Sequence, residues 1–261
     1  MKHPIHLLFL AAILPVFSAC SKGDADFFDN ANAPDSSSYD AEPGKEASAE
    51  QRFSFIATLH QTEAGEYYLQ IDAQTRVYPA NFRDLCAYDP VCPSRIVGEL
   101  VVFDRQVGNL GAYGLLEWFD FVQQGPVVGL YSGDLEDDAQ GVGAGDNPQT
   151  GTDGVDVLAD WMTSLEDGFL TLHIQTWWGF EPRRHEVRLV AGTNPNDPYE
   201  LLLLHFANND PKSFQADALV CYDLLNVLPR PNDPKNTVVT LKWTNDAGQT
   251  QSRTFQYTGR Y

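Results

Sequence analysis

Short segments in which apolar and polar residues alternate recur from residue 53 to the C-terminus, and they constrain the fold more than any other feature of this sequence. Phe53, Phe55 and Leu59 share one face of the first segment, and Leu170 and Leu172 share a face in a later one. Because successive side chains of a strand point to opposite faces, a period of two indicates half-buried strands. Aromatic residues make up 12% of the chain and no long helical periodicity is present, so the sequence predicts an all-β fold.

The first group of predicted strands is compact. It comprises Phe53–Leu59, Glu66–Asp72, Arg76–Tyr78, Gly98–Phe103 and Leu115–Val122. Five short strands in so short a stretch are typical of a small, partly closed barrel such as the OB-fold. We therefore assign residues 52–128 to an OB-like five-stranded β-barrel domain.

A second group of predicted strands follows, separated by turns rich in Asp, Asn and Gly. It comprises Val155–Met162, Phe169–Thr176, His185–Ala191, Tyr199–Phe206, Ala218–Leu224, Thr237–Thr244 and Thr254–Tyr257. About seven strands with this alternation predict an antiparallel β-sandwich, which we assign to residues 155–261.

Residues 129–154, between the two groups, are acidic and glycine-rich and lack apolar periodicity. We interpret them as a solvated linker. A calcium site is the alternative, because the segment carries carboxylates at Asp134, Glu136, Asp137, Asp138 and Asp146. Calcium loops place their ligands at alternate positions around a tight turn, however, and this spacing does not supply that pattern.

The N-terminus reads as an export signal. Lys2 precedes an apolar run that ends at the small residues Ser18 and Ala19, immediately before Cys20. The run is shorter than the roughly 20 residues that a membrane-spanning helix needs, and small residues at its end favour cleavage by a signal peptidase. The segment resembles a bacterial lipobox. We predict a signal peptide over residues 1–19 and a lipid on Cys20, with ordinary cleavage and a free Cys20 as the alternative.

Residues 20–51 are rich in Asp, Ser, Ala, Pro and Gly and have little to bury, so they predict a disordered tether. The net charge of −19 argues against nucleic acid as a partner, because phosphate binding needs clustered Lys and Arg. It argues equally against a basic patch that holds anionic lipid headgroups. The membrane contact is therefore expected through the lipid on Cys20, and we expect a lipid-anchored protein of the bacterial outer membrane, either periplasmic or surface-exposed.

Three further cysteines belong to the folded part. Cys86 and Cys92 lie in a turn-rich insertion, and an envelope location permits a disulfide between them. Two unpaired thiols are the alternative; zinc is disfavoured because it wants four ligands. Cys221 lies in an apolar segment and is expected to be a buried core thiol.

Several segments together resemble the NigD-like lipoproteins of Bacteroides and its relatives. They are Glu66–Asp72, Val77–Ala80, Asp156–Val157 with Trp161, Gly168–Leu172, and Tyr199–Asp210, the last being the most specific. The resemblance implies an N-terminal OB-like domain and a C-terminal β-sandwich behind a lipobox. The association of that family with a bacteriocin gene cluster implies a role in bacteriocin production or immunity. The cysteine-bearing insertion and the long acidic linker depart from the family pattern.

The best candidate for a binding surface is the aromatic cluster Trp177, Trp178 and Phe180, at an expected hairpin. Exposed rings there would form a platform for a sugar or a partner protein. The alternative is that these rings cap the end of the sandwich core. Two polar clusters have simpler explanations. His205 and Asn208–Asp210 are expected at a strand exit, and Arg183–Glu186 are expected to form surface ion pairs.

No motif in the sequence indicates catalysis. The histidines are dispersed without zinc-protease spacing, and neither a Gly-x-Ser-x-Gly nor a phosphate-binding glycine loop occurs. We expect no enzymatic activity, no cofactor and no metal. The sequence favours a non-catalytic binding or accessory module for an envelope protein, peptide or glycan. The alternatives are a bacteriocin-associated immunity or secretion factor, and an envelope hydrolase whose site is not visible in sequence.

Overall fold

The computed structural model describes residues 51–104, 111–129, 151, 153–181, 183–225, 227–228 and 237–261. The predicted signal peptide, Cys20 and the five candidate calcium ligands lie outside the described residues. Residues Ser48–Tyr261 form one compact unit. Within the described ranges, no helix is long and apolar enough to cross a membrane.

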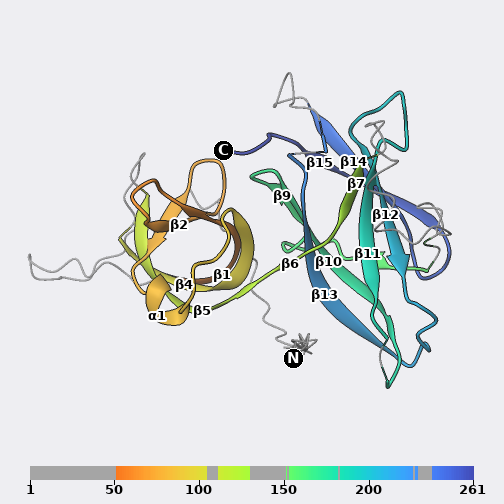
Figure 1. The fold of residues 1–261 in the computed structure, drawn as a ribbon, viewed down its shortest axis with the longest axis horizontal. Helices are drawn as coiled ribbons and strands as arrows, with labels where there is room; N and C mark the ends of the chain where they lie inside the picture. Colours follow the sequence, from red (N-terminus) through yellow and green to blue (C-terminus); the bar gives the residue numbers. More distant parts are fainter. Residues whose placement is uncertain are drawn as a thin grey trace, which may run out of the picture. The chain divides into compact units, whose positions relative to one another are not determined.

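The predicted all-β fold and OB-like barrel are confirmed. The barrel strands are β1 (Gln51–Gln61), β2 (Tyr67–Gln70), β3 (Arg76–Pro79), β4 (Ser94–Asp104) and β5 (Ala112–Phe121). They close in the order β1-β2-β3-β5-β4, and a single helical turn, α1 (Phe82–Leu85), follows β3 (Figure 1). Only the β3–β5 pairing is parallel within this barrel.

The barrel core follows from the alternation in the sequence. Phe55, Ala57 and Leu59 of β1 are buried, as are Leu69 and Leu100 from β2 and β4. Irregular pairing between β4 and β5 bends these two long strands so that the sheet can close.

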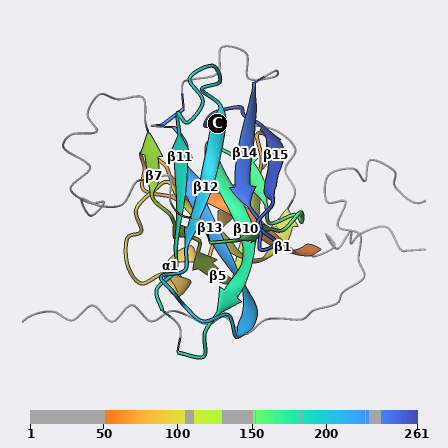
Figure 2. The same cartoon turned by 90° about the vertical axis from the view of Figure 1, so that its right-hand side faces the viewer.

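The C-terminal part contains two sheets. Its strands are β6 (Gln123–Gln124), β7 (Val127–Gly129), β8 (Asp156–Val157), β9 (Ser164–Glu166), β10 (Phe169–Trp178), β11 (Glu186–Ala191), β12 (Glu200–Phe206), β13 (Phe214–Asp223), β14 (Val238–Thr244) and β15 (Thr250–Gln256). One sheet has the order β6-β13-β10-β8, with β9 also on β10, and the other has the order β15-β14-β12-β11-β7. Figure 2 shows β11, β12, β14 and β15 side by side, in front of β10 and β13.

Leucines from both sheets fill the sandwich core. Leu172 of β10 and Leu189, Leu201 and Leu241 of the facing sheet are completely buried, together with Tyr222 of β13. The predicted β-sandwich is confirmed, but its sheets are mixed and not antiparallel throughout: β12 pairs in parallel with β14. The reason is that β13, which lies between them in the chain, belongs to the opposite sheet.

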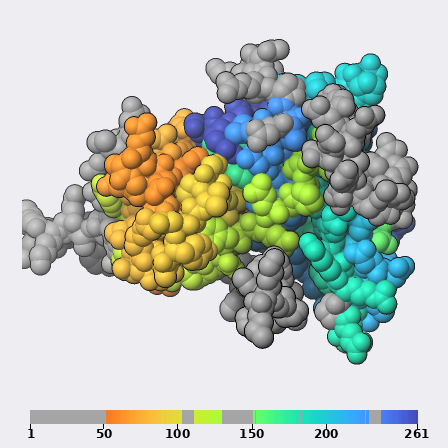
Figure 3. Space-filling view, in the orientation of Figure 1, coloured from red at the N-terminus to blue at the C-terminus, as the bar shows by residue number. Residues whose placement is uncertain are grey.

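The segment Gln123–Gly129 connects the two sheets of the sandwich. β6 pairs in parallel with β13, and β7 pairs in parallel with β11. Gly125 makes the crossing fit, because a Cβ atom at this position would lie 2.5 Å from Cε1 of Tyr222. The yellow-green atoms of residues 111–129 reach the surface in Figure 3. The sequence-based division assigns residues up to 128 to the barrel. The strand pairing adds that residues 123–129 contribute one short edge strand to each sheet of the sandwich.

Arg95 of β4 links barrel and sandwich strands within the compact unit. Its side chain is completely buried, and its Nη2 lies 2.9 Å from Glu166 Oε2 of β9. The same guanidinium donates to the hydroxyls of Thr58, Thr171 and, at 3.4 Å, Ser164. A buried charge needs such partners, so this arrangement holds β1 and β4 to β9 and β10.

Asp167 makes a second link next to this one. The carboxylate is buried, lies 2.5 Å from His60 Nε2 of β1, and accepts a hydrogen bond from the backbone N–H of Tyr261. The C-terminal residues therefore fasten onto the same turn that faces the barrel.

Candidate binding site

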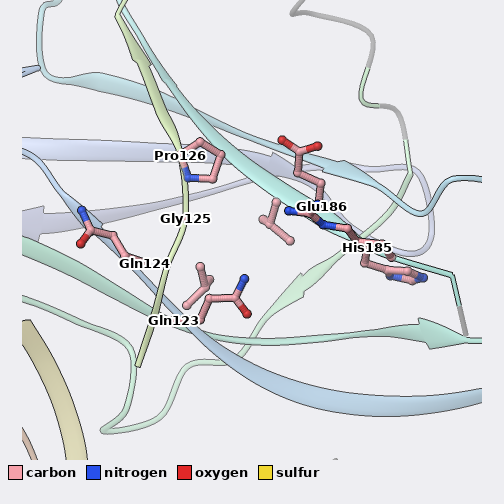
Figure 4. Close-up of a pocket in the computed structure, with 9 residues that line it drawn as sticks. Gln123, Gln124, Gly125, Pro126, His185 and Glu186 are labelled. Carbon is pink, nitrogen blue, oxygen red and sulfur yellow. The ribbon is translucent and has the colours of Figure 1, made fainter. Parts of the chain in front are cut away.

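An open cleft of about 540 Å³ lies where residues 123–126 pass the start of β11 (Figure 4). Its lining is mostly polar and comprises Gln123, Gln124, Gly125, Pro126, Arg184, His185, Glu186, Val187 and Val220. Figure 4 shows the Gln123 amide on the side of its strand toward His185 and the Gln124 amide on the opposite side. Val187 of β11 and Val220 of β13, from the two facing sheets, add apolar side chains to the lining.

His185 has close contacts on both ring nitrogens and on one ring face. Its Nε2 lies 3.1 Å from Asp210 Oδ2, and its Nδ1 lies 3.0 Å from His205 Nε2. The His205 Nδ1 lies 2.9 Å from the carbonyl oxygen of Gly154. The Trp178 ring stacks on the His185 ring with centroids 3.9 Å apart. Both ring nitrogens of His185 are thus engaged, and its face is covered.

The acceptors at the two ends of the chain of contacts Asp210–His185–His205–Gly154 determine which ring nitrogens donate. The carbonyl of Gly154 can only accept, and so can the Asp210 carboxylate. His205 Nδ1 is therefore the donor to the carbonyl of Gly154, and His185 Nε2 is the donor to the Asp210 carboxylate.

The pKa values of Asp210 and His205 are both lowered. The backbone N–H of Gly179 donates to Asp210 and lowers the pKa of its carboxyl, so Asp210 stays ionised. Burial lowers the pKa of His205. Burial therefore favours the neutral form of His205.

The polar cluster His205 and Asn208–Asp210, expected at a strand exit, has two separate roles in the structure. Asn208 and Asn209 have φ of 53° and 58°, a left-handed conformation that Asn tolerates better than most residues. This turn carries Asp210 back to His185. His205 and Asp210 thus join a histidine that precedes them by a whole hairpin, which their sequence spacing does not indicate.

The structure separates the three aromatic residues of the predicted binding surface. Trp177 and Trp178 are neighbours on β10, so their side chains point to opposite faces of the sheet. Trp178 stacks on His185, whereas Phe180 is 84% exposed and packs near Phe214. The three rings therefore do not form one flat platform, and a binding role for each stays a prediction.

The basic residues next to the cleft differ in their partners. Arg188 forms an ion pair with Glu186, and Arg183 donates to the carbonyl of Asn208. Arg184 is exposed and lines the cleft, and no ion pair of its side chain occurs with the residues that the structure describes. The expected set of surface ion pairs thus leaves one guanidinium facing the cleft.

The cysteines of the insertion lie close to the barrel core. Cys86 is buried, Cys92 is partly buried, and both sulfurs are free thiols in the structure. The disulfide between them stays a prediction for the oxidised protein. Cys221 is buried, as expected for a core thiol, and burial raises the pKa of this thiol to about 12.

The other histidines of the folded region are bound to carboxylates. His173 Nδ1 lies 2.5 Å from Asp160 Oδ2, and its Nε2 lies 3.6 Å from Asp217. Within the described part of the chain, no group of three or more His, Cys, Asp or Glu side chains is placed to hold a metal ion. The cleft thus gathers amide, guanidinium and carboxylate side chains beside two valines.

These features define a class of protein: a two-domain β protein with an OB-like barrel and a β-sandwich that carries an open polar cleft. Residues 140–257 match the NigD-like C-terminal beta sandwich domain. The sandwich is therefore similar to the NigD-like C-terminal domain, and the predicted resemblance to the NigD-like family is confirmed over these residues.

Solved structures share the fold over most of the chain. A protein from Parabacteroides distasonis described as toxin related has a TM-score of 0.58 and 19% identity, and the match covers 79% of this chain and 93% of that one. A NigD-like immunity protein from Bacteroides caccae has a TM-score of 0.50 and 16% identity, with 77% and 91% covered. A Bacteroides fragilis protein described as a lipoprotein has a TM-score of 0.50 and 11% identity, with 79% and 98% covered. The comparison with curated proteins gives no match.

Proposed function

We propose that this protein is a non-catalytic binding or accessory module that takes an envelope protein, peptide or glycan in the sandwich cleft. The cleft is the observation that carries the proposal. It offers hydrogen-bonding groups from Gln123, Arg184 and Glu186, while both ring nitrogens of His185 already have partners. A general base needs a nitrogen that can take a proton from a substrate, so this arrangement favours recognition over turnover.

We further propose that the protein is anchored in the bacterial outer membrane by lipid on Cys20 and faces either the periplasm or the exterior. The lipobox-like residues before Cys20 support this. The fold shared with a Bacteroides fragilis protein described as a lipoprotein is consistent with it. Several acyl chains hold a protein firmly, at about 0.8 kcal/mol for each buried methylene, and the acidic chain needs no basic patch.

Binding and turnover are separated by one experiment. Immobilised protein is incubated with fractionated envelope protein, peptide and glycan, and both the retained material and its mass are measured. We expect one fraction to be retained with unchanged mass, and retention to be lost in the double variant Arg184→Ala/Gln123→Ala. The matched control is Arg52→Ala/Gln61→Ala, which makes the same exchanges on exposed barrel positions. Shortening of a polymer at an enzyme-like rate would instead support the envelope hydrolase, and equal retention by both double variants would remove the cleft from the proposal.

A bacteriocin-associated immunity or secretion factor is the second candidate. It is favoured by the fold shared with a NigD-like immunity protein and with a protein described as toxin related. Deletion of the gene should then change sensitivity to a bacteriocin or its production by the same strain. Unchanged sensitivity and unchanged production would exclude this role.

A further inference from the structure

Strand β13 has an open edge beside the cleft. On one side it pairs along its whole length with β10, from Phe214 to Asp223. On the other side β6 pairs only with Val220 and Cys221. Among the residues that the structure describes, the stretch Phe214–Ala218 therefore has no strand on that side.

The direction in which the backbone groups of β13 point follows from the hydrogen bonds at the C-terminal end of this strand. The carbonyl of Cys221 accepts from Gly125 and so points to the β6 side, whereas the N–H of Leu224 bonds to Gly168 on the β10 side. Because backbone groups alternate along a strand, both the N–H and the C=O of Gln215 and Asp217 point to the open edge. Both residues are exposed. Such a row of backbone donors and acceptors is a template for another strand.

The side chains on the inner face of Phe214–Ala218 are small, and this face continues toward the cleft. Ala216 and Ala218 point to the interior, on the face that carries Val220. Arg184, which precedes β11 of the facing sheet by two residues, lines the cleft. Packed sheets lie about 10 Å apart, a gap that an Arg side chain and an acidic side chain from an added strand can span together.

We propose that the open edge of β13 and the cleft together bind an extended peptide as an added strand, with an acidic side chain of the peptide directed inward to Arg184. The proposal rests on the binding function proposed above and assigns its ligand class. An extended peptide supplies the backbone groups that Gln215 and Asp217 need. Its inward side chains meet Val187 and Val220, and a carboxylate there satisfies a guanidinium in the bidentate geometry that Arg favours.

The charges around the edge also set the pattern of the peptide. Asp217 projects to the outer face, where its Oδ1 accepts from Gln175. A second carboxylate directly opposite Asp217 would be repelled, because like charges facing each other across strands destabilise a sheet. The acidic residue is therefore expected on the inward face only, with neutral residues outside.

A peptide series tests this pattern with the full mature protein. The probes are Ac-Thr-Val-Thr-Glu-Thr-Val-Thr-NH2 and the versions in which Glu is replaced by Gln or Lys, each with a fluorophore, measured by anisotropy. We expect the Gln peptide to bind about tenfold more weakly than the Glu peptide, which is the range for losing a charged hydrogen bond. In Arg184→Glu the preference should reverse toward the Lys peptide, whereas Arg52→Ala should bind all three as the wild type does. Equal affinity for the three peptides would overturn the assignment of Arg184.

Strand addition itself is tested at the backbone. Gln215→Pro removes an N–H that faces the open edge and no bond to β10, so it should fold normally and lose peptide binding. Gln215→Ala is the control that keeps the N–H, and matching thermal melts of the two variants show that both are folded. A Glu peptide N-methylated at alternate residues should bind at least about tenfold more weakly. Unchanged binding in Gln215→Pro and by the methylated peptide would overturn strand addition.

Two further outcomes also contradict the proposal. A dimer in sedimentation that Gln215→Pro dissociates would make the occupant a second copy of this chain. If no peptide binds while an envelope glycan fraction is still retained through Arg184 and Gln123, the binding function stands and the peptide inference falls. If nothing is retained at all, both fall.

Discussion

Replacing Arg95 by Ala should destabilise the protein by several kcal/mol and weaken the coupling of barrel and sandwich. The guanidinium is completely buried and bonds to Glu166, Thr58 and Thr171. Removing one partner of a buried ion pair costs about 3–5 kcal/mol. Both threonine hydroxyls are buried, and a buried group left without its bond costs about 1–3 kcal/mol.

These contributions overlap, and Glu166 is 34% exposed and can recover some hydration. We therefore expect a loss of about 4 kcal/mol in the free energy of unfolding, which is a large part of the roughly 5–15 kcal/mol that holds most native proteins together. At about 2–4 °C for each kcal/mol, the melting temperature should fall by roughly 10 °C.

The assay is chemical unfolding followed by tryptophan fluorescence and by far-UV circular dichroism. In Arg95→Ala the two signals should separate into distinct transitions, because Arg95 lies on β4 and its partners Thr171 and Glu166 lie on β10 and β9. Arg95→Lys should be intermediate, since Lys keeps the charge but lacks the planar fork of donors. Arg52→Ala is the control, because the Arg52–Glu117 pair is exposed and such pairs contribute little. A single transition within about 1 kcal/mol of the wild type would refute the reasoning.

Four further predictions concern the other titratable and reactive groups. The pKa of Asp210 is lowered in the folded state, so the stability that this carboxylate contributes is present above the unfolded pKa of 3.8 and is lost as the pH falls through the lower folded value. In Asp210→Asn the free energy of unfolding should therefore fall less steeply at acid pH. An unchanged acid dependence would contradict this. Cys20→Ser should abolish incorporation of labelled fatty acid and move the protein to the soluble fraction, whereas retained label would place the lipid elsewhere. Cys221, whose pKa burial raises to about 12, should react with iodoacetamide only after denaturation; rapid labelling of the native protein would show that the core opens. Peptide mapping without reductant tests the predicted bond between Cys86 and Cys92, which a linked peptide would establish and two alkylated peptides would exclude.

The sequence predicts strands best where one face of a sheet is buried. The alternation of Phe53, Phe55 and Leu59 locates β1, and that of Leu170 and Leu172 locates β10, because burial of one face imposes a period of two. The pairing partners do not follow from that period. Nothing in the alternation of β12 and β14 states that they run in parallel, because their neighbourhood depends on where β13 goes.

The candidate site was visible only in fragments. His205 and Asp210 stand out as polar residues after a run of leucines, and His185 stands out beside two arginines. Their association requires that β11 and β12 form a hairpin and that Asn208 and Asn209 adopt left-handed conformations. The Asn-Asn pair is a turn signal, but a turn signal does not specify which side chain lies across the sheet. The contacts of His185 with His205 and Asp210 therefore depend on tertiary packing.

The periodicity of the sequence reveals neither the cleft nor the open edge of β13. Residues 123–126 leave β13 after pairing with Val220 and Cys221 and cross to β11. Gly125 and Pro126 make the crossing, and a segment that crosses between sheets has no buried face to impose alternation. Because β6 runs parallel to β13, the residues that would extend this pairing over Asp217 and Gln215 precede Gln123, and they belong to β5 of the barrel. The crossing at Gly125 and Pro126 lines the cleft, and the place of β5 in the barrel leaves the edge of β13 unpaired, so a ligand that mimics a strand can use both features.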